Sequence, residues 1–234
     1  MDTDLAAELK LRAISTIDEV ADELCSISHD IWDNPELCFE ESFAHDRLCD
    51  ALEGHGLLTT RHAYGLDTAF EAVAGSSGAE VGVFCEYDAL PGIGHACGHN
   101  IIAAAGIGAG LAAASVAEAA GGRVRILGTP AEEGGGGKVF MAREGALEGL
   151  SAALMVHPAD QDLATMDVIA NQQILVEYHG RAAHAAAAPH LGVNALDAAV
   201  IGYMAVAALR QHIGDQQRLH GVFTDGGDKP NIVP

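Results

Sequence analysis

The pattern of apolar and polar positions predicts helices at the start of the chain. In residues 3–27 apolar side chains recur every three or four residues, as in an amphipathic helix that packs one face against a core. These side chains are Leu5, Leu9, Ile14, Ile17, Val20, Leu24 and Ile27. Residues 34–36 predict a turn, and a second helix is predicted over residues 40–53, where Gly54 and Gly56 follow.

The middle of the chain alternates between strand-like and helix-like patterns. The predicted strands cover residues 57–62, 68–74, 80–86, 124–128 and 152–156, and the predicted helices cover residues 100–119 and 137–147. This alternation favours an α/β fold, in which a largely parallel mixed sheet is flanked by helices. We therefore expect the first domain to occupy residues 1–170.

The pattern changes again after residue 170. A β-like run at residues 173–179 is followed by a predicted helix over residues 193–212 and a further predicted strand at residues 218–224. These elements predict part of a smaller α+β domain over residues 171–234.

The charge balance narrows the range of partners. The 234 residues include 12 basic and 33 acidic side chains, which gives a formal net charge of −21. Nucleic acids and anionic membrane surfaces are poor partners for such a chain, because their phosphates would be repelled. Solubility is the simpler explanation of this acidity. Adaptation to high salt is the alternative, since salt screens the repulsion between surface charges.

The cysteines and the apolar stretches bear on the cellular setting. The five cysteines lack paired short spacings, and the acidic start of the chain lacks the apolar region of a signal peptide, so we expect a cytoplasmic protein. Residues 101–117 carry no charge and include Gly106 and Gly110, a spacing also found in membrane helices. Because alanine and glycine supply little hydrophobic drive, we expect a buried helix of a soluble domain here, with no membrane partner.

Polar side chains that bind metals follow the predicted strands. Glu86 and Asp88 follow one strand, Glu132 and Glu133 follow the next, and His157 ends a third. In sheets of this kind, ligands lie at the carboxyl ends of the strands. We therefore expect three separated segments to converge on one crevice.

The donor types in these segments suit zinc, which accepts imidazole nitrogen, thiolate sulfur and carboxylate oxygen. The predicted metal ligands are Cys97, His99, Glu133 and His157. Glu132 is adjacent to a ligand and is the natural general base for a metal-bound water. Asp88 is expected to orient a ligand imidazole without itself binding the metal.

Two other interpretations use the same segments. Cys97 is a candidate nucleophile with His99 or His95 as its base, but a cysteine hydrolase leaves the carboxylate pair and the strand-end histidine unexplained. The glycines at residues 134–137 and the following Lys138 suggest a phosphate-binding loop. That motif fails, because its first glycine position holds a glutamate and no serine or threonine follows the lysine.

Six motifs together resemble a known family. They are Glu-Tyr-Asp-Ala-Leu-Pro at residues 86–91, Gly-Ile-Gly-His-Ala-Cys-Gly-His-Asn at 92–100, Gly-Thr-Pro-Ala-Glu-Glu-Gly-Gly-Gly-Gly-Lys at 128–138, His-Pro at 157–158, Gly-Arg-Ala-Ala-His at 180–184 and Pro-Asn-Ile-Val-Pro at 230–234. In this order they resemble the two-domain zinc metallopeptidases that include aminoacylase and carboxypeptidase G. The likeness is strongest to the aminoacylase-like branch with β-alanyl-lysine dipeptidase and the B subunit of p-aminobenzoyl-glutamate hydrolase.

The resemblance implies an activity and adds two site residues. It implies metal-dependent hydrolysis of an amide bond in an N-acyl amino acid or dipeptide, with two zinc ions, or manganese or cobalt, activating a water whose proton Glu132 takes. His184 matches a histidine of a lid domain that reaches the site of a second subunit and stabilises the tetrahedral intermediate. Asn231 matches a substrate-contacting asparagine. The lid also implies a homodimer.

The chain departs from the family in its length. Family members continue after the lid and supply a final metal-binding histidine and an arginine for the substrate carboxylate, and neither segment is present here. We therefore expect a C-terminally truncated chain with weak binding of the second metal and little activity alone. The alternative function is then a catalytically idle metal-binding or dimerising remnant. Asn100 stands where the indole-acetyl-type hydrolases carry an aspartate, which favours the dipeptidase-like branch.

Overall fold

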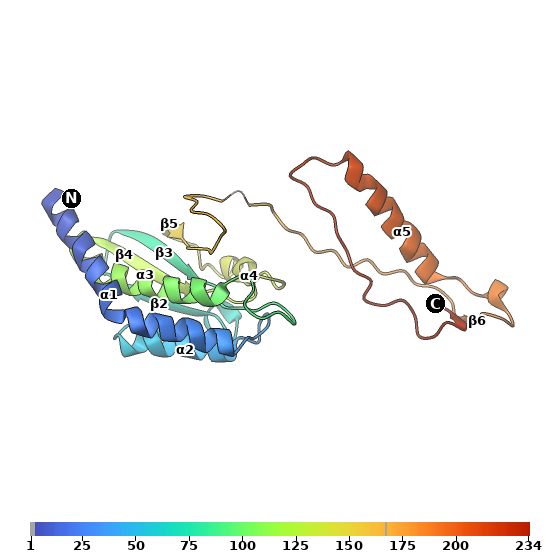
Figure 1. The fold of residues 1–234 in the computed structure, drawn as a ribbon, viewed down its shortest axis with the longest axis horizontal. Coiled ribbons are helices and arrows are strands. Elements are labelled where there is room, and N and C mark those ends of the chain that lie inside the picture. The colour runs from blue at the N-terminus through green and yellow to red at the C-terminus, as the bar shows by residue number, and fades with distance from the viewer. Residues whose placement is uncertain (1–2, 167) are drawn as a thin grey trace. The chain divides into compact units, whose positions relative to one another are not determined.

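The computed structural model describes residues 3–166 and 168–234. The chain divides into two compact units, Met1–Asp162 and Leu163–Pro234, and each is described by itself (Figure 1). The sequence prediction placed the boundary between the two domains at residue 170.

Two helices begin the first unit. Helix α1 spans Thr3–Asp33, six residues beyond the end predicted from its apolar repeat, and α2 spans Ser42–Gly54. The start of α2 is capped by Glu36, whose carboxylate accepts hydrogen bonds from the backbone amides of Phe43 and Ala44 at 2.9 and 3.0 Å. Such bonds satisfy amides that have no partner within the helix.

A five-stranded mixed sheet forms the centre of this unit, in the order β1-β2-β4-β3-β5. The strands are β1 (Thr59–Arg61), β2 (Phe70–Ala74), β3 (Ala79–Cys85), β4 (Gly122–Gly128) and β5 (Leu150–Leu154). Strand β3 pairs in parallel with both β4 and β5, whereas β2 pairs antiparallel with β1 and β4. The predicted α/β class is therefore confirmed, and parallel pairing holds for the three strands that precede the candidate site.

Helix α3 (His99–Ala120) packs against the sheet and against α1, and its glycines allow both close approaches. A Cβ atom on Gly106 would stand 2.5 Å from Cys85 Sγ, and one on Gly108 would stand 2.7 Å from Leu24 Cδ1 of α1. Among the described helices α3 is long and apolar enough to cross a membrane, yet 61% of its most apolar window is buried inside the protein. The small residues thus serve packing, as the buried-helix interpretation predicted.

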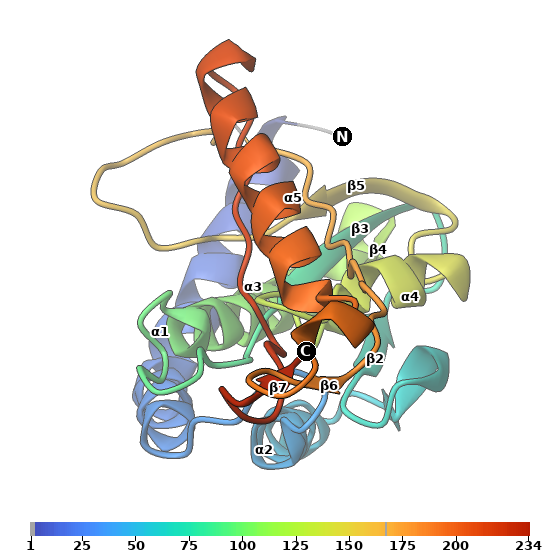
Figure 2. The ribbon, with the colours of Figure 1, turned by 90° about the vertical axis from the view of Figure 1, so that its right-hand side faces the viewer.

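Side chains alternate between the two faces of the sheet. Val83 and Ile126 face the main core beneath α2 and α3, whereas their neighbours Phe84 and Leu127 join a smaller cluster with Met141. Met141 belongs to the short helix α4 (Gly137–Arg143), and a 3₁₀ turn, η1, covers Ala63–Gly65. Figure 2 shows the layers, with α1 and α3 on one side of the sheet and α4 on the other.

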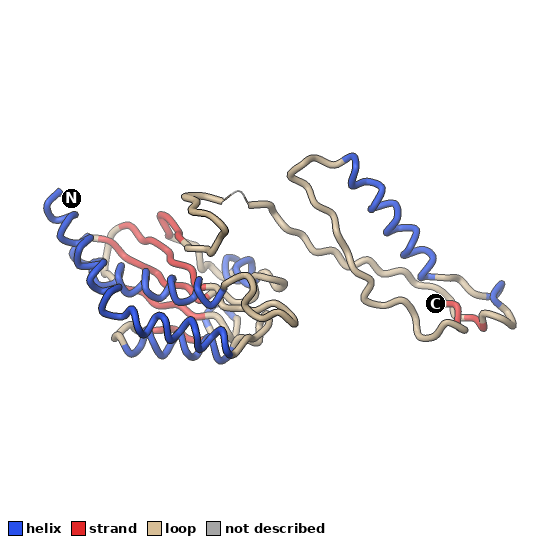
Figure 3. Tube along the Cα trace, in the orientation of Figure 1, coloured by secondary structure: helices blue, strands red, loops and turns tan. Residues whose placement is uncertain are grey.

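The second unit has one long helix and little sheet (Figure 3). Helix α5 spans Ala195–Leu209 and is capped by Asn194, whose side chain accepts a hydrogen bond from the amide of Asp197 at 2.9 Å. Strands β6 (Ala183–His184) and β7 (Ile232–Val233) pair antiparallel. The 3₁₀ turns η2 and η3 cover Pro189–Leu191 and Arg210–His212.

Two strand predictions in this unit were wrong. Residues 173–179 and 218–224 contain no β-strand. Their apolar side chains suit a strand, but Ile174 and Val222 are 74% and 85% exposed. A strand forms only where a neighbouring strand accepts its backbone hydrogen bonds, and these segments lack one in the described structure.

Candidate metal centre

Predicted site residues of the first unit lie in the segments that follow the carboxyl ends of its three parallel strands. Asp88 follows β3, the Glu132–Glu133 pair follows β4, and His157 follows β5. The structure brings these segments together around His99, the first residue of α3, as the strand order predicts.

Glycine at residue 98 makes the turn that presents His99. Gly98 has φ +84° and caps α3, a backbone conformation that other residues adopt only with strain. A Cβ atom there would also stand 2.9 Å from Cγ of Pro158, the residue after His157. The space that Gly98 leaves therefore lets the segment after β5 approach the start of α3.

His99 is fully buried and surrounded by carboxylates. Its Nδ1 lies 3.0 Å from Asp88 Oδ1, and its Nε2 lies 3.6 Å from Glu86 Oε2 and 3.8 Å from carboxylate oxygens of both Glu132 and Glu133. Burial by itself lowers the pKa of His99, but Asp88 and the neighbouring acids outweigh it and raise the pKa. With Nδ1 bonded to Asp88, Nε2 is the nitrogen that faces the carboxylate cluster.

Asp88 is held on two sides. Its second oxygen, Oδ2, accepts a hydrogen bond from the amide of Glu133 at 2.9 Å. Burial raises the pKa of Asp88, but the hydrogen bonds from His99 and from this amide prevail and lower it. An ionised Asp88 thus fixes both the ring of His99 and the backbone of the carboxylate pair.

Cys97 and His157 form the other half of the cluster. Cys97 Sγ lies 3.6 Å from His157 Nε2, while His157 Nδ1 lies 2.8 Å from the carbonyl oxygen of Pro158. Nδ1 therefore carries the proton, and the lone pair of Nε2 faces the Cys97 thiol. Burial, and next the adjacent Glu133, raise the pKa of Cys97 to about 12. Without a cation nearby, this thiol stays protonated and is a poor nucleophile.

These residues fit a divalent metal. Ligand atoms of Cys97, His99 and His157 lie within 4.8 Å of one another, as do those of Glu86, His99 and Glu132. Three buried atoms here lack a hydrogen-bond partner among the described protein atoms, namely Glu86 Oε2, His99 Nε2 and Glu133 Oε1. Buried polar atoms are normally paired, and a cation bound to nitrogen, sulfur and oxygen donors would satisfy them.

Sequence reasoning gave no role to Glu86 or Lys138, yet both belong to the site. Glu86 is 3% exposed, and Lys138 of α4 forms an ion pair with its Oε1. The lysine thus balances part of the acidic charge around His99. Its place after a strand put Glu86 at the predicted crevice without a role, and Lys138 directly follows the glycine run.

Glu132 differs from its neighbours in exposure. Its side chain is 46% exposed, whereas that of Glu133 is 19% exposed. Partial burial, and then the charges of Glu86 and Glu133, raise the pKa of Glu132. A half-exposed carboxylate with a raised pKa suits proton transfer better than an ordinary surface acid does.

The second unit holds the other two predicted site residues. His184 in β6 pairs with Ile232, and the amide of Ala185 donates to the carbonyl of Asn231 at 3.0 Å, so His184 and Asn231 are neighbours. Nδ1 of His184 accepts hydrogen bonds from the amides of Ala186 and Ala187 at 3.2 and 3.1 Å. Its Nε2 therefore carries the proton and is available as a donor.

The fold and the site define an α/β protein with a candidate divalent-metal centre at the carboxyl edge of its sheet. No family model matches the chain. It is 45% identical to the Xaa-Arg dipeptidase of Mus musculus over 99% of its own length and 58% of that protein. It is 38% identical to the B subunit of p-aminobenzoyl-glutamate hydrolase from Escherichia coli, covering 88% of this chain and 47% of that one. The chain thus spans about half the length of these curated relatives.

Solved structures share the fold. An aminobenzoyl-glutamate utilization protein from Klebsiella pneumoniae superposes with a TM-score of 0.66 at 17% identity, over 95% of this chain and 66% of that one. A dinuclear metal-binding peptidase of the M20 family from Bacillus subtilis gives a TM-score of 0.50 at 24% identity, over 58% and 42%. The chain belongs to the aminoacylase-like metallopeptidase family of these curated relatives, as its motifs predicted.

Proposed function

We propose that this protein hydrolyses an amide bond with the help of divalent metal bound around His99. The observation that carries the proposal is the convergence of three strand ends on this buried histidine, whose Nε2 has no hydrogen-bond partner in the described structure. A purely structural histidine would be expected to have both ring nitrogens paired.

In this proposal two zinc ions occupy the site, with manganese or cobalt as the alternatives. The proposed ligands are Cys97, His99, Glu133 and His157. When bound, such ions supply a water of low pKa and polarise the scissile carbonyl. Their charge would also favour the Cys97 thiolate, which the surrounding acids otherwise disfavour.

The residues of the chain divide the remaining work. Glu132 takes the proton of the attacking water and returns it to the leaving amine, a role that its raised pKa supports. Asp88 holds His99 in one orientation through the 3.0 Å contact with Nδ1. His184 donates from Nε2 to the oxyanion, which agrees with the tautomer set by the two backbone amides at Nδ1. Asn231, beside His184, contacts the substrate.

The proposed substrates are dipeptides and N-acyl amino acids. The names of the relatives support this class, because one is a dipeptidase for Xaa-Arg and another a hydrolase for p-aminobenzoyl-glutamate. We further propose a cytoplasmic homodimer that forms through the second unit, which corresponds to the lid domain. In this dimer His184 of one subunit serves the metal centre of the other.

The test is hydrolysis by metal-free protein to which zinc, cobalt or manganese is returned. The substrates are ordinary dipeptides, including those that end in arginine, β-alanyl dipeptides and N-acyl amino acids. We expect low turnover of at least one class, seen only with metal, and weaker metal binding in Cys97→Ser. Activity that requires the thiol but no metal would favour a cysteine hydrolase. Bound metal without turnover on any substrate would favour an idle remnant.

A further inference from the structure

Glu41, just before α2, has a carboxylate that is fully buried, and the hydrogen-bond donors that reach its two oxygens are neutral. Oε1 accepts a hydrogen bond from the backbone amide of Ala131 at 2.8 Å, and Oε2 accepts one from the hydroxyl of Thr68 at 2.8 Å. Glu36 already caps α2, so the side chain of Glu41 is not needed for that purpose. Burying a carboxylate beside neutral donors costs free energy. We therefore ask what the residue that it contacts does.

That target is the residue before the carboxylate pair. Ala131 has φ +57°, a left-handed conformation that is strained for a non-glycine residue. Its carbonyl oxygen lies 3.2, 2.7 and 3.2 Å from the amide nitrogens of Gly135, Gly136 and Gly137. Glu132 and Glu133 thus directly follow a strained residue. Its amide is held by Glu41, and its carbonyl is held by the amides of the glycine run.

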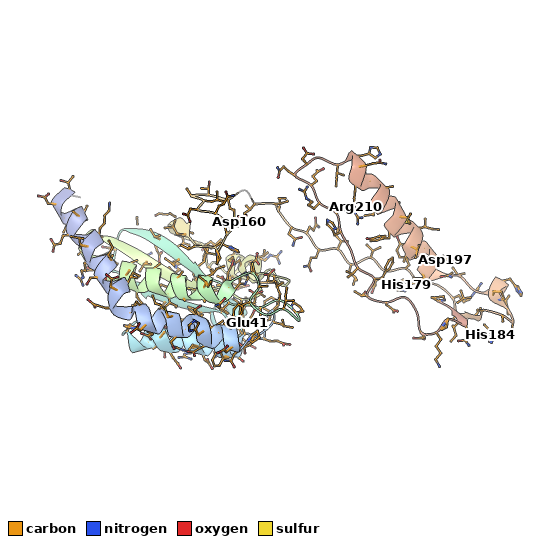
Figure 4. All side chains as sticks on the ribbon, in the orientation of Figure 1. Glu41, Asp160, His179, His184, Asp197 and Arg210 are labelled. Carbon is orange, nitrogen blue, oxygen red and sulfur yellow. The ribbon has the colours of Figure 1, made fainter. Side chains whose placement is uncertain are left out.

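The segment that contains Glu41 also fits this loop sterically. Phe39 has φ +64°, and its ring fills the space beside Gly135, where a Cβ atom would stand 2.4 Å from Phe39 Cε2. The thiol of Cys38 lies 3.7 Å from Asp88 Oδ2, and the carbonyl of Glu36 accepts a bond from the amide of Ala89. Figure 4 labels Glu41 near the loops of the first unit. The segment therefore contacts two of the loops that supply the metal centre, those after β3 and β4.

We propose that Glu41 is a positioning residue, which holds Ala131 in its left-handed conformation and so aims Glu132 and Glu133 at the metal centre. Asp88 fixes the far side of the same turn through the amide of Glu133 at 2.9 Å. Glu132 then lies between two anchored backbone positions. This inference rests on the proposed function, but its first consequence is for metal binding rather than for turnover.

The experiment compares Glu41→Leu with Thr68→Val in the full chain. Thr68→Val removes only the bond from the threonine hydroxyl, whereas Glu41→Leu removes the carboxylate and so also releases the amide of Ala131. Zinc affinity, measured by competition with a chelator, is expected to fall about 10- to 100-fold in Glu41→Leu. Thr68→Val is expected to stay within a few-fold of the parent, and Glu41→Gln, whose amide oxygen can still accept from Ala131, to recover most of the affinity.

A spectroscopic measurement separates positioning from general destabilisation. The absorption of bound cobalt(II), which reports ligand geometry, should change in Glu41→Leu and not in Thr68→Val. Unchanged zinc affinity and cobalt spectrum in folded Glu41→Leu would overturn the proposal, as would equal losses in the two variants. If Glu41→Leu does not fold, Glu41→Asp replaces it, because its shorter carboxylate falls short of Ala131. Parent protein that binds zinc but hydrolyses nothing would refute the proposed function and leave this comparison intact.

Discussion

Helices α3 and α5 are both apolar, but their surroundings differ. Ile107 and Leu111 of α3 are buried in the main core with residues of α1, α2 and the sheet, whereas α5 has no buried residue. No described residue of the second unit is buried. The metal-centre residues are therefore positioned by a packed core, whereas His184 is positioned by local backbone hydrogen bonds and a two-residue strand pair.

This difference separates two functional contributions. Side chains of the first unit are expected to set metal affinity and proton transfer, since their geometry depends on the sheet. His184 and Asn231 of the second unit are expected to affect turnover without affecting metal affinity. Variants in the two units should therefore fail in different assays.

The largest effect is expected at Glu132. Glu132→Gln removes the proposed base but keeps the size of the side chain, so hydrolysis should fall about 10²- to 10⁴-fold. Zinc affinity should fall far less than hydrolysis, because the four proposed ligands are unchanged. Steady-state kinetics and zinc titration measure the two quantities, with the exposed Glu144→Gln as the matched control. Retained activity in Glu132→Gln would refute the proposed mechanism.

The next effect is expected at His184. His184→Ala removes the proposed donor to the oxyanion, and loss of one such donor typically lowers kcat about 10²- to 10³-fold. Zinc affinity should stay at the parent value, because none of the proposed ligands belongs to the second unit. A parallel fall in zinc affinity would contradict the separation between the units.

Mixing two inactive variants sharpens this prediction. If His184 serves the metal centre of a second subunit, mixed dimers of Glu132→Gln and His184→Ala contain one site with both original residues. Part of the activity should then return when the two proteins are unfolded and refolded together. An inactive mixture that nevertheless contains mixed dimers would place both residues in the same subunit's site.

The sequence predicted the convergence at His99 because that result follows from chain order. Parallel strands place their carboxyl ends at one edge, so Asp88, Glu133 and His157 had to meet once the alternating pattern was recognised. The role proposed for Glu41 could not be predicted in this way. Its partner Ala131 is 90 residues away, and only the tertiary structure shows the contact.

The strand predictions in the second unit failed for a related reason. Residues 173–179 have the composition of a strand, but composition does not supply the neighbour that a strand needs. The ion pair between Glu86 and Lys138 likewise depends on how α4 lies beside the end of β3. A pattern within one segment was therefore not sufficient where the element or contact depends on a neighbour from another segment.

A matched pair of isoleucines tests the packing difference directly. Ile107 of α3 is fully buried and Ile201 of α5 is 69% exposed, although both lie within apolar helices. Ile107→Ala should lower the free energy of unfolding by about 2–5 kcal/mol, because it leaves a cavity in the core. Ile201→Ala should change it by less than about 0.5 kcal/mol. Urea unfolding measures both, and a comparable loss for Ile201→Ala would show that α5 is covered in the protein in solution.

The smallest effect concerns pH and buried histidine. His45 of α2 is 1% exposed, whereas all five histidines of the second unit are exposed. Burial lowers the pKa of His45, and the contact with Asp46 only partly opposes this. Below the ordinary histidine pKa of about 6.5, the unfolded chain takes up a proton that the folded chain resists. His45 therefore lowers the free energy of unfolding as the pH falls from about 7 to 5, by at most about 1.4 kcal/mol per pH unit.

The check is urea unfolding of metal-free protein at several pH values between about 5 and 7. His45→Gln should unfold more easily at neutral pH, since it disturbs a packed site, yet lose less stability on acidification than the parent protein does. His190→Gln is the matched control from the second unit, because His190 is exposed and its loss should leave the pH dependence unchanged. A parent-like slope in His45→Gln would mean that other groups govern the acid sensitivity. Burial of His45 in the first unit would then not explain the loss of stability in acid, and the two units would not differ in this respect.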